Sequence, residues 1–439
     1  MEHKRLLLIS YYFPPCGGAA VQRWLRFLPF LVRAGWETHV LTTVGGDYPQ
    51  LDESLLQSLP AELVIHRTPA PRLAGLWNLF LGQGSRLPHG DLSSSNHDPL
   101  LKRILIWVRL NLIIPDLRVF WNPSAYRKAK NVIQTRGIRT MITTGPPHST
   151  HLLGLALRKS YHLKWIADWR DPWSSIHYLQ LNPPSAISLR MHKYLESKVC
   201  ASADLNLVIS RHLLNSLPKG YKLLLMNGFD LKEVIRAKED AKRANADKIT
   251  APGIHHFLVS YVGQITAGQD LDALLDILSC FRDCHVLKVR FIGSDLSPEQ
   301  RQSIDSQLGP VAETIPYLPH QDAMMEMARS HLLLMMINRY EGFEGMLTTK
   351  LFEYLGVGVP ILAIGPRGGE AEALINTYQA GLCVDRDGAA TAKAWISDLY
   401  ERFLQCKHVS NAEDLSSLSS ESQSKVLIEA LNKLSQFEN

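Results

Sequence analysis

Two glycines near the N-terminus lie where an apolar run gives way to a helical pattern. Residues 14–19 read Pro-Pro-Cys-Gly-Gly-Ala, between the apolar run 5–10 and a helix expected over 20–34. Gly17 and Gly18 carry no Cβ, so backbone amides there can approach a phosphate or a sugar, and the helix dipole favours an anion. The segment lacks the Gly-x-Gly-x-x-Gly fingerprint of dinucleotide-binding loops, and it also fits a simple tight turn.

A second loop, in the other half of the chain, combines glycines, cations and carboxylates. It follows an apolar strand expected over 332–337 and leads into a helix, so its amides can bind phosphates. Lys350 can neutralise those phosphates, and Glu353, one turn further, can accept hydrogen bonds from ribose hydroxyls. The alternative is a capped helix with a solvated Glu353. The candidate nucleotide-binding residues of this segment are Arg339, Glu341, Gly342, Phe343, Lys350, Leu351 and Glu353.

Polar residues also follow two expected strands of the first half. Residues 144–150 read Thr-Gly-Pro-Pro-His-Ser-Thr, and residues 166–173 read Ile-Ala-Asp-Trp-Arg-Asp-Pro-Trp. Asp168 and Asp171 could orient a hydroxyl group and take its proton. An equally simple interpretation is an internal ion pair with Arg170 that braces the loop.

Each of these segments lies between an expected strand and an expected helix. In the first half, apolar runs at 5–10, 36–43, 63–66, 138–144, 163–167, 205–210 and 222–226 predict a parallel sheet. In the second half, strands at 257–263, 287–293, 314–318, 332–337 and 361–364 alternate with helices. The predicted fold class is α/β, with two doubly wound, Rossmann-like domains facing a central cleft at the carboxyl ends of their strands.

The expected domain boundaries follow from shifts in composition. The N-terminal domain covers 1–226, with an insertion at about 68–136. A charged, apolar-poor stretch at 227–252 is expected to be a linker. The C-terminal domain covers 253–410, and 411–439 forms a tail with an amphipathic helix.

Composition places the chain among ordinary globular proteins. It has 439 residues, of which 46% are hydrophobic, and a net charge of +5. Its 6 cysteines are too few and too scattered for a disulfide framework, which favours reduced thiols in the cytoplasm. There is no signal-peptide pattern and no apolar run of about 18 residues, the length that a membrane span needs.

Several motifs match a known family in their order and spacing. The glycine loop with the following helix and strand, the run Asn227-Gly228-Phe229-Asp230, and Tyr261-Val262-Gly263-Gln264 look like its signatures. Glu341-Gly342-Phe343, Glu353 and the run Gly-Val-Gly-Val-Pro-Ile-Leu-Ala at 356–363 fall in its donor-binding region. The chain thus resembles the GT-B glycosyltransferases, specifically glycosyltransferase family 4, over nearly its whole length.

The resemblance implies a retaining transferase that uses a nucleotide-diphosphate sugar, most simply a UDP-sugar, without a bound metal or other cofactor. It implies that the C-terminal domain binds the donor, with Gly263 and Gln264 at the start of that domain, and that the N-terminal domain binds the acceptor. It also implies that a polar residue after the first domain's strands contacts the transferred sugar or the acceptor. His148 is our choice, although a structural role is an alternative. Closure of the cleft would bring Gly17 and Gly18 against the donor.

The chain departs from the family pattern at two places. Family members commonly have two glutamates eight positions apart, but the residue eight before Glu353 is Gly345. Many members also place Arg and Lys after the glycine that corresponds to Gly263, whereas residues 264–269 contain no cation. A departing diphosphate still needs positive charge or amide donors. Lys350, Arg339, Arg367 or the helix start at Gly368 and Gly369 could supply them.

Other chemistries find little support in the sequence. Asp270-Leu271-Asp272 has the pattern of an acidic first helical turn, and Asp385-Arg386-Asp387 that of a turn before Gly388, so neither indicates a metal site. No nucleic-acid-binding fold is indicated, because the basic residues are interleaved with apolar ones.

Charge is unevenly distributed along the chain. Residues 1–226 contain 27 Lys+Arg against 13 Asp+Glu, and within 100–139 the one acid is Asp116. Cations among Trp and aliphatic residues are typical of interfacial helices, so 100–139 is a candidate for peripheral contact with an anionic membrane. The alternative is a core helix with solvated Arg and Lys.

Together these features predict an enzyme that transfers a hexose-type sugar from a nucleotide diphosphate to a lipid-linked or cell-surface polysaccharide, such as an exopolysaccharide or lipopolysaccharide. Its expected location is the cytoplasm, at the inner face of the cytoplasmic membrane. Two alternatives stay open: a sugar-nucleotide epimerase of the same fold, and a non-catalytic partner that binds nucleotides or glycans.

Overall fold

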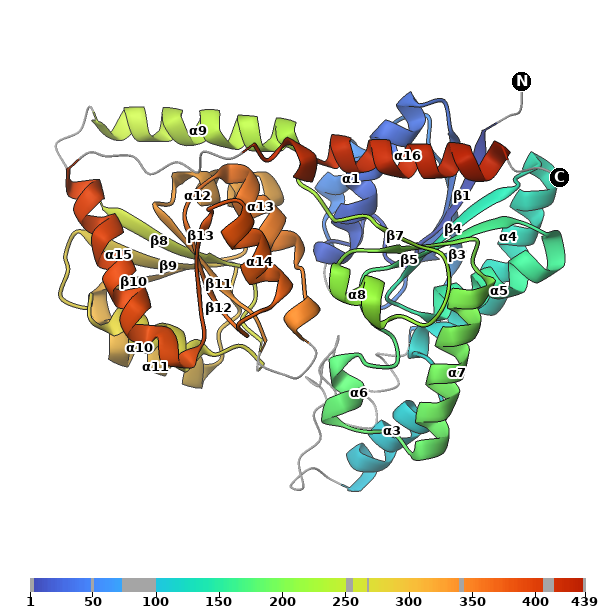
Figure 1. Cartoon of the computed structure of the whole chain (residues 1–439), viewed down its shortest axis with the longest axis horizontal. Helices are drawn as coiled ribbons and strands as arrows, with labels where there is room; N and C mark the ends of the chain where they lie inside the picture. Colours follow the sequence, from blue (N-terminus) through green and yellow to red (C-terminus); the bar gives the residue numbers. More distant parts are fainter. Residues whose placement is uncertain are drawn as a thin grey trace. The chain divides into compact units, whose positions relative to one another are not determined.

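The computed structural model describes residues 4–48, 51–72, 100–249, 256–266, 268–338, 343–405 and 414–436. The chain divides into two compact units (Figure 1). The first unit contains Met1–Asn227 and Glu421–Asn439, and the second contains Gly228–Ser420. Both are α/β, as the sequence predicts.

The first unit is built on a seven-stranded parallel sheet in the order β3-β2-β1-β4-β5-β6-β7. Its strands are β1 (Arg5–Ile9), β2 (Glu37–Val44), β3 (Val64–Pro69), β4 (Thr140–Gly145), β5 (Lys164–Trp169), β6 (Leu205–Val208) and β7 (Lys222–Leu224). Its helices are α1 (Ala19–Arg33), α3 (Leu100–Asn111), α4 (Asn122–Arg136), α5 (Ser149–Tyr161), α6 (His177–Leu181), α7 (Ala186–Ser202), α8 (Arg211–Ser216) and α16 (Ser420–Gln436), with short 3-10 turns at Glu53–Ser58 and Leu117–Trp121.

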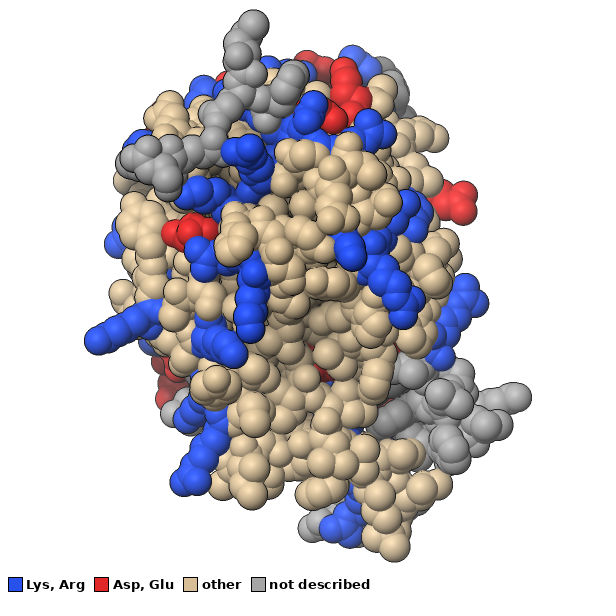
Figure 2. Space-filling view, turned by 90° about the vertical axis from the view of Figure 1, so that its right-hand side faces the viewer, with Lys and Arg blue, Asp and Glu red and all other residues tan. Residues whose placement is uncertain are grey.

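Side chains of β1 alternate between two cores, as expected for a strand buried on both faces. Leu6 and Leu8 pack in a cluster with α1 and α16, and Leu7 and Ile9 pack in a cluster with α4, α5 and α7. Leu427 supplies the α16 contact, so residues far along the chain complete the first unit's core. The face of this unit drawn in Figure 2 carries many Lys and Arg and few Asp and Glu.

The second unit is built on a six-stranded parallel sheet in the order β10-β9-β8-β11-β12-β13. Its strands are β8 (Phe257–Val262), β9 (Leu287–Ile292), β10 (Ala312–Ile315), β11 (Leu332–Met336), β12 (Ile361–Ile364) and β13 (Gly381–Val384). Its helices are α9 (Leu231–Ile249), α10 (Leu271–Ser279), α11 (Pro298–Leu308), α12 (His320–Arg329), α13 (Thr349–Val357), α14 (Glu370–Thr377) and α15 (Ala389–Leu404), with 3-10 turns at Gly309–Val311, Phe343–Gly345, Arg386–Gly388 and Ser416–Leu418.

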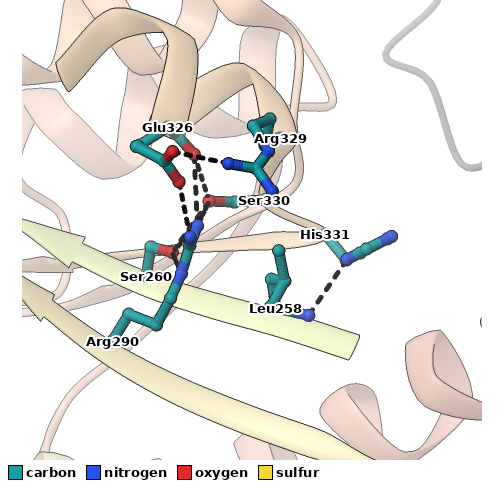
Figure 3. Close-up of polar contacts among 7 residues, drawn as sticks. All are labelled: Leu258, Ser260, Arg290, Glu326, Arg329, Ser330 and His331. Atoms are coloured by element: carbon teal, nitrogen blue, oxygen red, sulfur yellow. Dashed lines mark hydrogen bonds and ion pairs between the residues drawn. The ribbon is translucent and has the colours of Figure 1, made fainter. Parts of the chain in front are cut away.

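A buried polar network fixes α12 to the sheet of the second unit (Figure 3). The Arg290 guanidinium on β9 donates to Glu326 Oε2 at 2.5 Å and to Ser260 Oγ of β8 at 2.9 Å. Ser330 Oγ donates to the Glu326 carbonyl at 2.8 Å, and Arg329 donates to the other oxygen of the same carboxylate at 2.7 Å. Because both charges are paired, the carboxylate and the guanidinium can be buried between helix and strands.

Three of the expected boundaries need correction. The division at Asn227 lies one residue from the expected end of the first domain, but 227–252 is wrong as a separate linker, because α9 belongs to the second unit. The tail expected at 411–439 is also wrong as a unit of its own, because residues from Glu421 onward belong to the first unit. The insertion expected at about 68–136 is too long, because α4 is the crossover helix between β3 and β4.

Candidate functional site

Both sheets have a switch point where the strand order reverses, and the chemically interesting loops lie there. In the second unit the loops after β8 and β11 leave the sheet from neighbouring strands, and in the first unit the loops after β1 and β4 do the same. Ligands of open α/β sheets bind at such points. The structure therefore brings Gly263 near the 343–350 segment in one unit, and Gly17 near the 145–151 segment in the other.

Lys350 lies beside the loop that follows β8. It lies in the first turn of α13, and its Nζ stands 4.1 Å from the centre of the Tyr261 ring. A Cβ built on Gly263 would lie 3.2 Å from Nζ, and Gly263 has a φ of +110° that favours glycine. Within the described part of the chain, no acceptor is within hydrogen-bond or ion-pair distance of Nζ. An anion that enters here would find a positive charge beside free helix-terminal amides.

The burial of Lys350 changes its acidity. Desolvation lowers the pKa of Lys350 from 10.5 to about 8, and the nearby Glu353 carboxylate opposes that effect. A lysine that loses hydration without gaining an acceptor is poised to bind a negative ligand, which would restore its charge.

Gln264 has a structural task in this arrangement. Its Nε2 donates to the Gly293 carbonyl at 2.8 Å, and its Oε1 accepts from the Asp295 amide at 3.0 Å. These bonds join the loop after β8 to the loop after β9. Gln264 therefore fixes the shape of the loop that contains Gly263, and its side-chain amide is already bonded within the protein.

The other predicted residues of this half occupy different environments. Leu351 is fully buried, so only its backbone can face a ligand. Glu353 is 7% exposed, and its Oε1 lies 3.9 Å from His320 Nε2 of α12, which corrects the alternative of a solvated carboxylate. Phe343 begins the 3-10 turn before α13. Arg339, Glu341 and Gly342 lie outside the described residues.

The helix start at Gly368 and Gly369 already holds a carboxylate. Glu372 accepts from the Gly368 amide at 2.5 Å and from Arg367 Nε at 2.8 Å. Arg367 and these glycines are therefore less available to a diphosphate than Lys350 is.

The first-unit glycine loop has the backbone geometry that the sequence predicts. Gly18 is the N-cap of α1 with a φ of 89°, and no side chain caps this helix. A Cβ on Gly18 would meet nothing within 4 Å. Gly17 is buried and Gly18 is exposed, so the helix N-terminus opens to its surroundings at Gly18.

Asp168, expected as a catalytic carboxylate, is fully buried and fully engaged. It accepts from Arg23 Nη2 at 2.9 Å, from Trp24 Nε1 at 3.0 Å and from Thr144 Oγ1 at 2.8 Å. Arg23 also donates to Asn227 Oδ1 at 3.1 Å, so this pair joins α1, β4, β5 and the end of the first unit's chain segment. The ion pair is thus between Asp168 and Arg23, a residue that the sequence analysis missed, rather than with Arg170.

Arg170 and Asp171 behave differently from the pair just described. Arg170 donates to the carbonyls of Gly145, Ala20 and Pro146, so it ties the loops together without a carboxylate. Asp171 is half-buried, two residues after the end of β5, and has no hydrogen bond within the described part of the chain. Burial raises the pKa of Asp171, while Arg170 and His177 lower it. Of the two predicted carboxylates, Asp171 alone keeps its lone pairs for a ligand.

His148 lies inside an aromatic cluster that the sequence did not reveal. It is 2% exposed, its ring stacks on Trp173 at 5.5 Å between centroids, and its Nε2 lies 3.2 Å from the Pro172 carbonyl. His151 and Trp169 complete the cluster around it. Its Nδ1 has no hydrogen-bond partner among the residues that the structure describes. His148 can shape the floor of a site here, but its ring is not open to solvent.

Acid is expected to destabilise the first unit because its buried histidines resist protonation. Burial lowers the pKa of His148 and of His192 from 6.5 to about 4, and it lowers the pKa of His151 well below 6.5. The unfolded chain then binds protons that the folded chain does not, so stability is complete above pH 6.5 and falls towards pH 4. Each such histidine contributes a slope of about 1.4 kcal/mol per pH unit in that window.

Urea unfolding followed by tryptophan fluorescence measures this effect, since eight of the nine tryptophans lie in the first unit. The midpoint should be level above about pH 6.5 and fall from there to pH 5, and His192→Phe should reduce the slope of that fall by about one proton. Equal unfolding midpoints at pH 7 and pH 5 would contradict the lowered pKa values of these histidines.

Other observations bear on metal and membrane chemistry. Among the described residues, no group of three or more His, Cys, Asp or Glu side chains could hold a metal ion. Asp270 instead caps α10 by accepting from the Ala273 amide, and Asp385 accepts from the Gly388 amide. No helix in the described ranges is long and apolar enough to cross a membrane.

Comparisons with known proteins agree with this architecture. No family model matches the sequence, and a comparison with curated proteins found no match. Solved structures match over nearly the whole chain. The Anabaena protein HepE, solved with UDP and glucose, is 14% identical with a TM-score of 0.63, covering 98% of this chain and 100% of HepE.

Two further structures are similar at comparable levels. WaaG, described as a glycosyltransferase involved in lipopolysaccharide biosynthesis, is 12% identical with a TM-score of 0.56, covering 96% of this chain and 99% of WaaG. A putative UDP-N-acetylglucosamine 2-epimerase from Listeria monocytogenes is 10% identical with a TM-score of 0.53, covering 99% of this chain and 98% of the epimerase chain. At these identities the likeness concerns the fold, and the chain has the GT-B fold that the sequence predicts.

Proposed function

We propose that this protein is a glycosyltransferase that moves a hexose-type sugar from a UDP-sugar to a glycan acceptor. The observation that carries the proposal is Lys350, a half-buried cation with no acceptor in the described part of the chain, beside Gly263 at the switch point of the second sheet. The GT-B fold and the UDP and glucose in the HepE structure support it. We extend the assignment to retention of anomeric configuration and to action without a bound metal, both on the family resemblance.

The proposed donor site uses groups of the second unit. Lys350 and the N-terminal amides of α13 bind the diphosphate, and Glu353 with the loop at 341–343 binds the ribose and base side. As the bond from the anomeric carbon to the diphosphate oxygen breaks, negative charge grows on the leaving group, and a fixed cation stabilises it. Burial makes that stabilisation stronger than it would be in water.

The proposed acceptor site uses the first unit. An acceptor hydroxyl must lose its proton as its oxygen bonds to the anomeric carbon, and Asp171 is the carboxylate that we assign to it. Asp171 has a raised pKa and no hydrogen bond within the described residues, so it suits the role of proton acceptor better than Asp168, whose oxygens already accept several hydrogen bonds. His148 then acts as a positioning residue behind Asp171, whereas Asp168 has a structural role through its ion pair with Arg23. Gly17 and Gly18 stay proposed donor-binding residues.

We further propose that the acceptor is a lipid-linked or cell-surface polysaccharide, used at the inner face of the cytoplasmic membrane. The similarity to WaaG, with its part in lipopolysaccharide biosynthesis, and the basic first unit support this choice.

Calorimetric titration with UDP, GDP and ADP, each with and without magnesium, tests the donor assignment. We expect UDP to bind with micromolar affinity and without a requirement for magnesium. Binding of GDP or ADP in its place would keep a transferase but change its donor. A folded protein that binds none of the three would favour the alternative of a non-catalytic partner.

An epimerase is the second candidate, because one similar structure is a putative UDP-N-acetylglucosamine 2-epimerase. Incubation with UDP-N-acetylglucosamine, followed by proton NMR, distinguishes the two. Inversion at C2 in the absence of any acceptor would favour the epimerase.

A further inference from the structure

Two helices of the first unit expose apolar stripes with the same spacing. On α3, Leu100, Ile104 and Trp107 are 71%, 48% and 54% exposed, and on α7, Ile187, Met191 and Tyr194 are 77%, 44% and 58% exposed. Each set follows an i, i+4, i+7 pattern, so each forms one face of its helix. Large exposed apolar faces of this kind mark contact surfaces.

The two helices belong to one packed substructure. Asn111 at the end of α3 accepts from the Ser185 amide through its Oδ1 at 2.7 Å, and its carbonyl accepts from Ser188 Oγ at 3.0 Å. The opposite side of α3 packs through Ile106 and Leu110 against Ile176 and Leu179. The exposed stripes are therefore held in place by buried contacts rather than carried on loose segments.

The charges beside the stripes are of one sign. Lys102 and Arg103 lie on α3, and Arg190, Lys193 and Lys198 lie on α7. The acid within these helices is Glu196, whose carboxylate faces inward and accepts from the Trp173 amide at 3.1 Å and from Ser174 Oγ at 2.5 Å. The surface is thus apolar and cationic, in keeping with the basic face in Figure 2.

Residues 122–136, which the sequence grouped with α3 as a membrane candidate, do not expose an apolar face. Helix α4 buries its apolar residues Ala125, Ala129, Val132 and Ile133 against the sheet. Its outer face offers cations such as Arg127 and Lys130 without exposed aliphatic partners. The expected contact region of 100–139 therefore narrows to α3 and gains α7, which the sequence had not indicated.

We infer that the exposed faces of α3 and α7 form a docking surface for a bilayer that contains anionic phospholipid. Trp and aliphatic side chains enter the headgroup boundary, and each cation that reaches an anionic leaflet adds about 1 kcal/mol. Self-association is the other occupant to consider. A twofold contact through this surface would set the same cations against one another, which charge complementarity disfavours. The inference rests on the proposed function only for the choice of a membrane-bound acceptor.

Co-sedimentation of the full-length protein with vesicles tests the inference. One vesicle preparation contains phosphatidylcholine alone, and the other contains equal parts of phosphatidylcholine and phosphatidylglycerol. We expect binding to the anionic vesicles, weakened by high salt. The double variant Trp107→Ser, Ile187→Ser removes two exposed anchors and should weaken binding at least about 10-fold without loss of folding.

A matched pair of charge variants locates the surface. The double variant Arg190→Gln, Lys193→Gln on α7 should weaken binding to anionic vesicles about 10-fold or more. The double variant Arg127→Gln, Lys130→Gln on α4 should keep most of the wild-type binding to these vesicles. Both pairs are exposed, have the same spacing and remove the same charge. An equal loss in both pairs would overturn the inference in favour of diffuse attraction, and so would a wild-type protein that ignores anionic vesicles.

Two further readouts separate the possible failures. Sedimentation velocity detects self-association, and a dimer that Trp107→Ser, Ile187→Ser converts to a monomer would overturn the membrane assignment. UDP titration of the same preparations reports the donor site. Retained UDP binding with no vesicle binding rejects the docking surface alone, whereas vesicle binding without any nucleotide binding rejects the proposed function alone.

Discussion

Lys350→Met is expected to weaken UDP binding by about 10- to 100-fold, because it removes a charge-assisted contact worth about 1.5–3 kcal/mol. Met keeps most of the side-chain volume against Tyr261. The variant should unfold at the same or a higher denaturant concentration than the wild type, because a desolvated charge disappears from α13. Calorimetry gives the affinity and urea unfolding gives the stability.

The pH dependence of UDP binding is an independent test of the contact between Lys350 and UDP. The pKa of about 8 in the free protein means that Lys350 is charged below pH 8 and increasingly neutral above it. UDP affinity should therefore be level below pH 8 and fall about 10-fold per pH unit above it. In Lys350→Met this fall should disappear. A wild-type affinity that stays level to pH 10 would reject the contact, and Lys393→Met, at an exposed ion pair with Asp276, serves as the matched control.

Asp168→Asn and Asp171→Asn should have opposite effects on the stability of the first unit. Asp168 holds the buried Arg23, so Asp168→Asn leaves that guanidinium without its counter-charge and should cost about 3 kcal/mol or more. Asp171 is a half-buried carboxylate with a raised pKa, so Asp171→Asn removes a desolvation penalty and should leave stability unchanged or higher at pH 7. Urea unfolding followed by tryptophan fluorescence measures both.

The same two variants should affect sugar transfer in the reverse order, with Asp171→Asn the more damaging of the two. Asp171→Asn should lower sugar transfer by about 100-fold or more while UDP binding stays normal, because proton transfer is affected and the donor site is not. Asp168→Asn should lose activity only in proportion to its loss of folded protein. A stable Asp171→Asn variant with full transfer activity would remove Asp171 from the mechanism.

The sequence predicts the elements of this fold better than it predicts the partners of its polar residues. Strands and helices follow from local periodicity, and the switch points follow from strand order, so the loops at Gly17, Gly263 and Lys350 could be found in advance. The roles of Asp168 and Asp171 could not be separated, because the partner that occupies Asp168 is 145 positions away at Arg23. The one sign in the sequence was Arg23 itself, a charged residue within the apolar pattern of the first helix, which indicates a buried partner of opposite charge.

Burial set by tertiary packing accounts for the other differences. His148 looked like an available side chain because its enclosure depends on Trp173 and His192, which come from separate segments. Helices α3 and α4 have similar basic and apolar compositions, but α4 spans the crossover to β4 and buries its apolar side while α3 does not. Periodicity marks an apolar face without saying what covers it.

The place of α16 has a consequence for the order in which a nascent chain can fold. Leu427 and Leu431 fill the same core as Leu6 and Leu8, and Gln423 Oε1 accepts from the Met226 amide at 2.9 Å. The second unit, Gly228–Ser420, can close its core before α16 leaves the ribosome, whereas the first unit cannot. The earlier-synthesised unit is therefore the later one to mature, and its unfinished apolar face is the natural target for chaperones during translation.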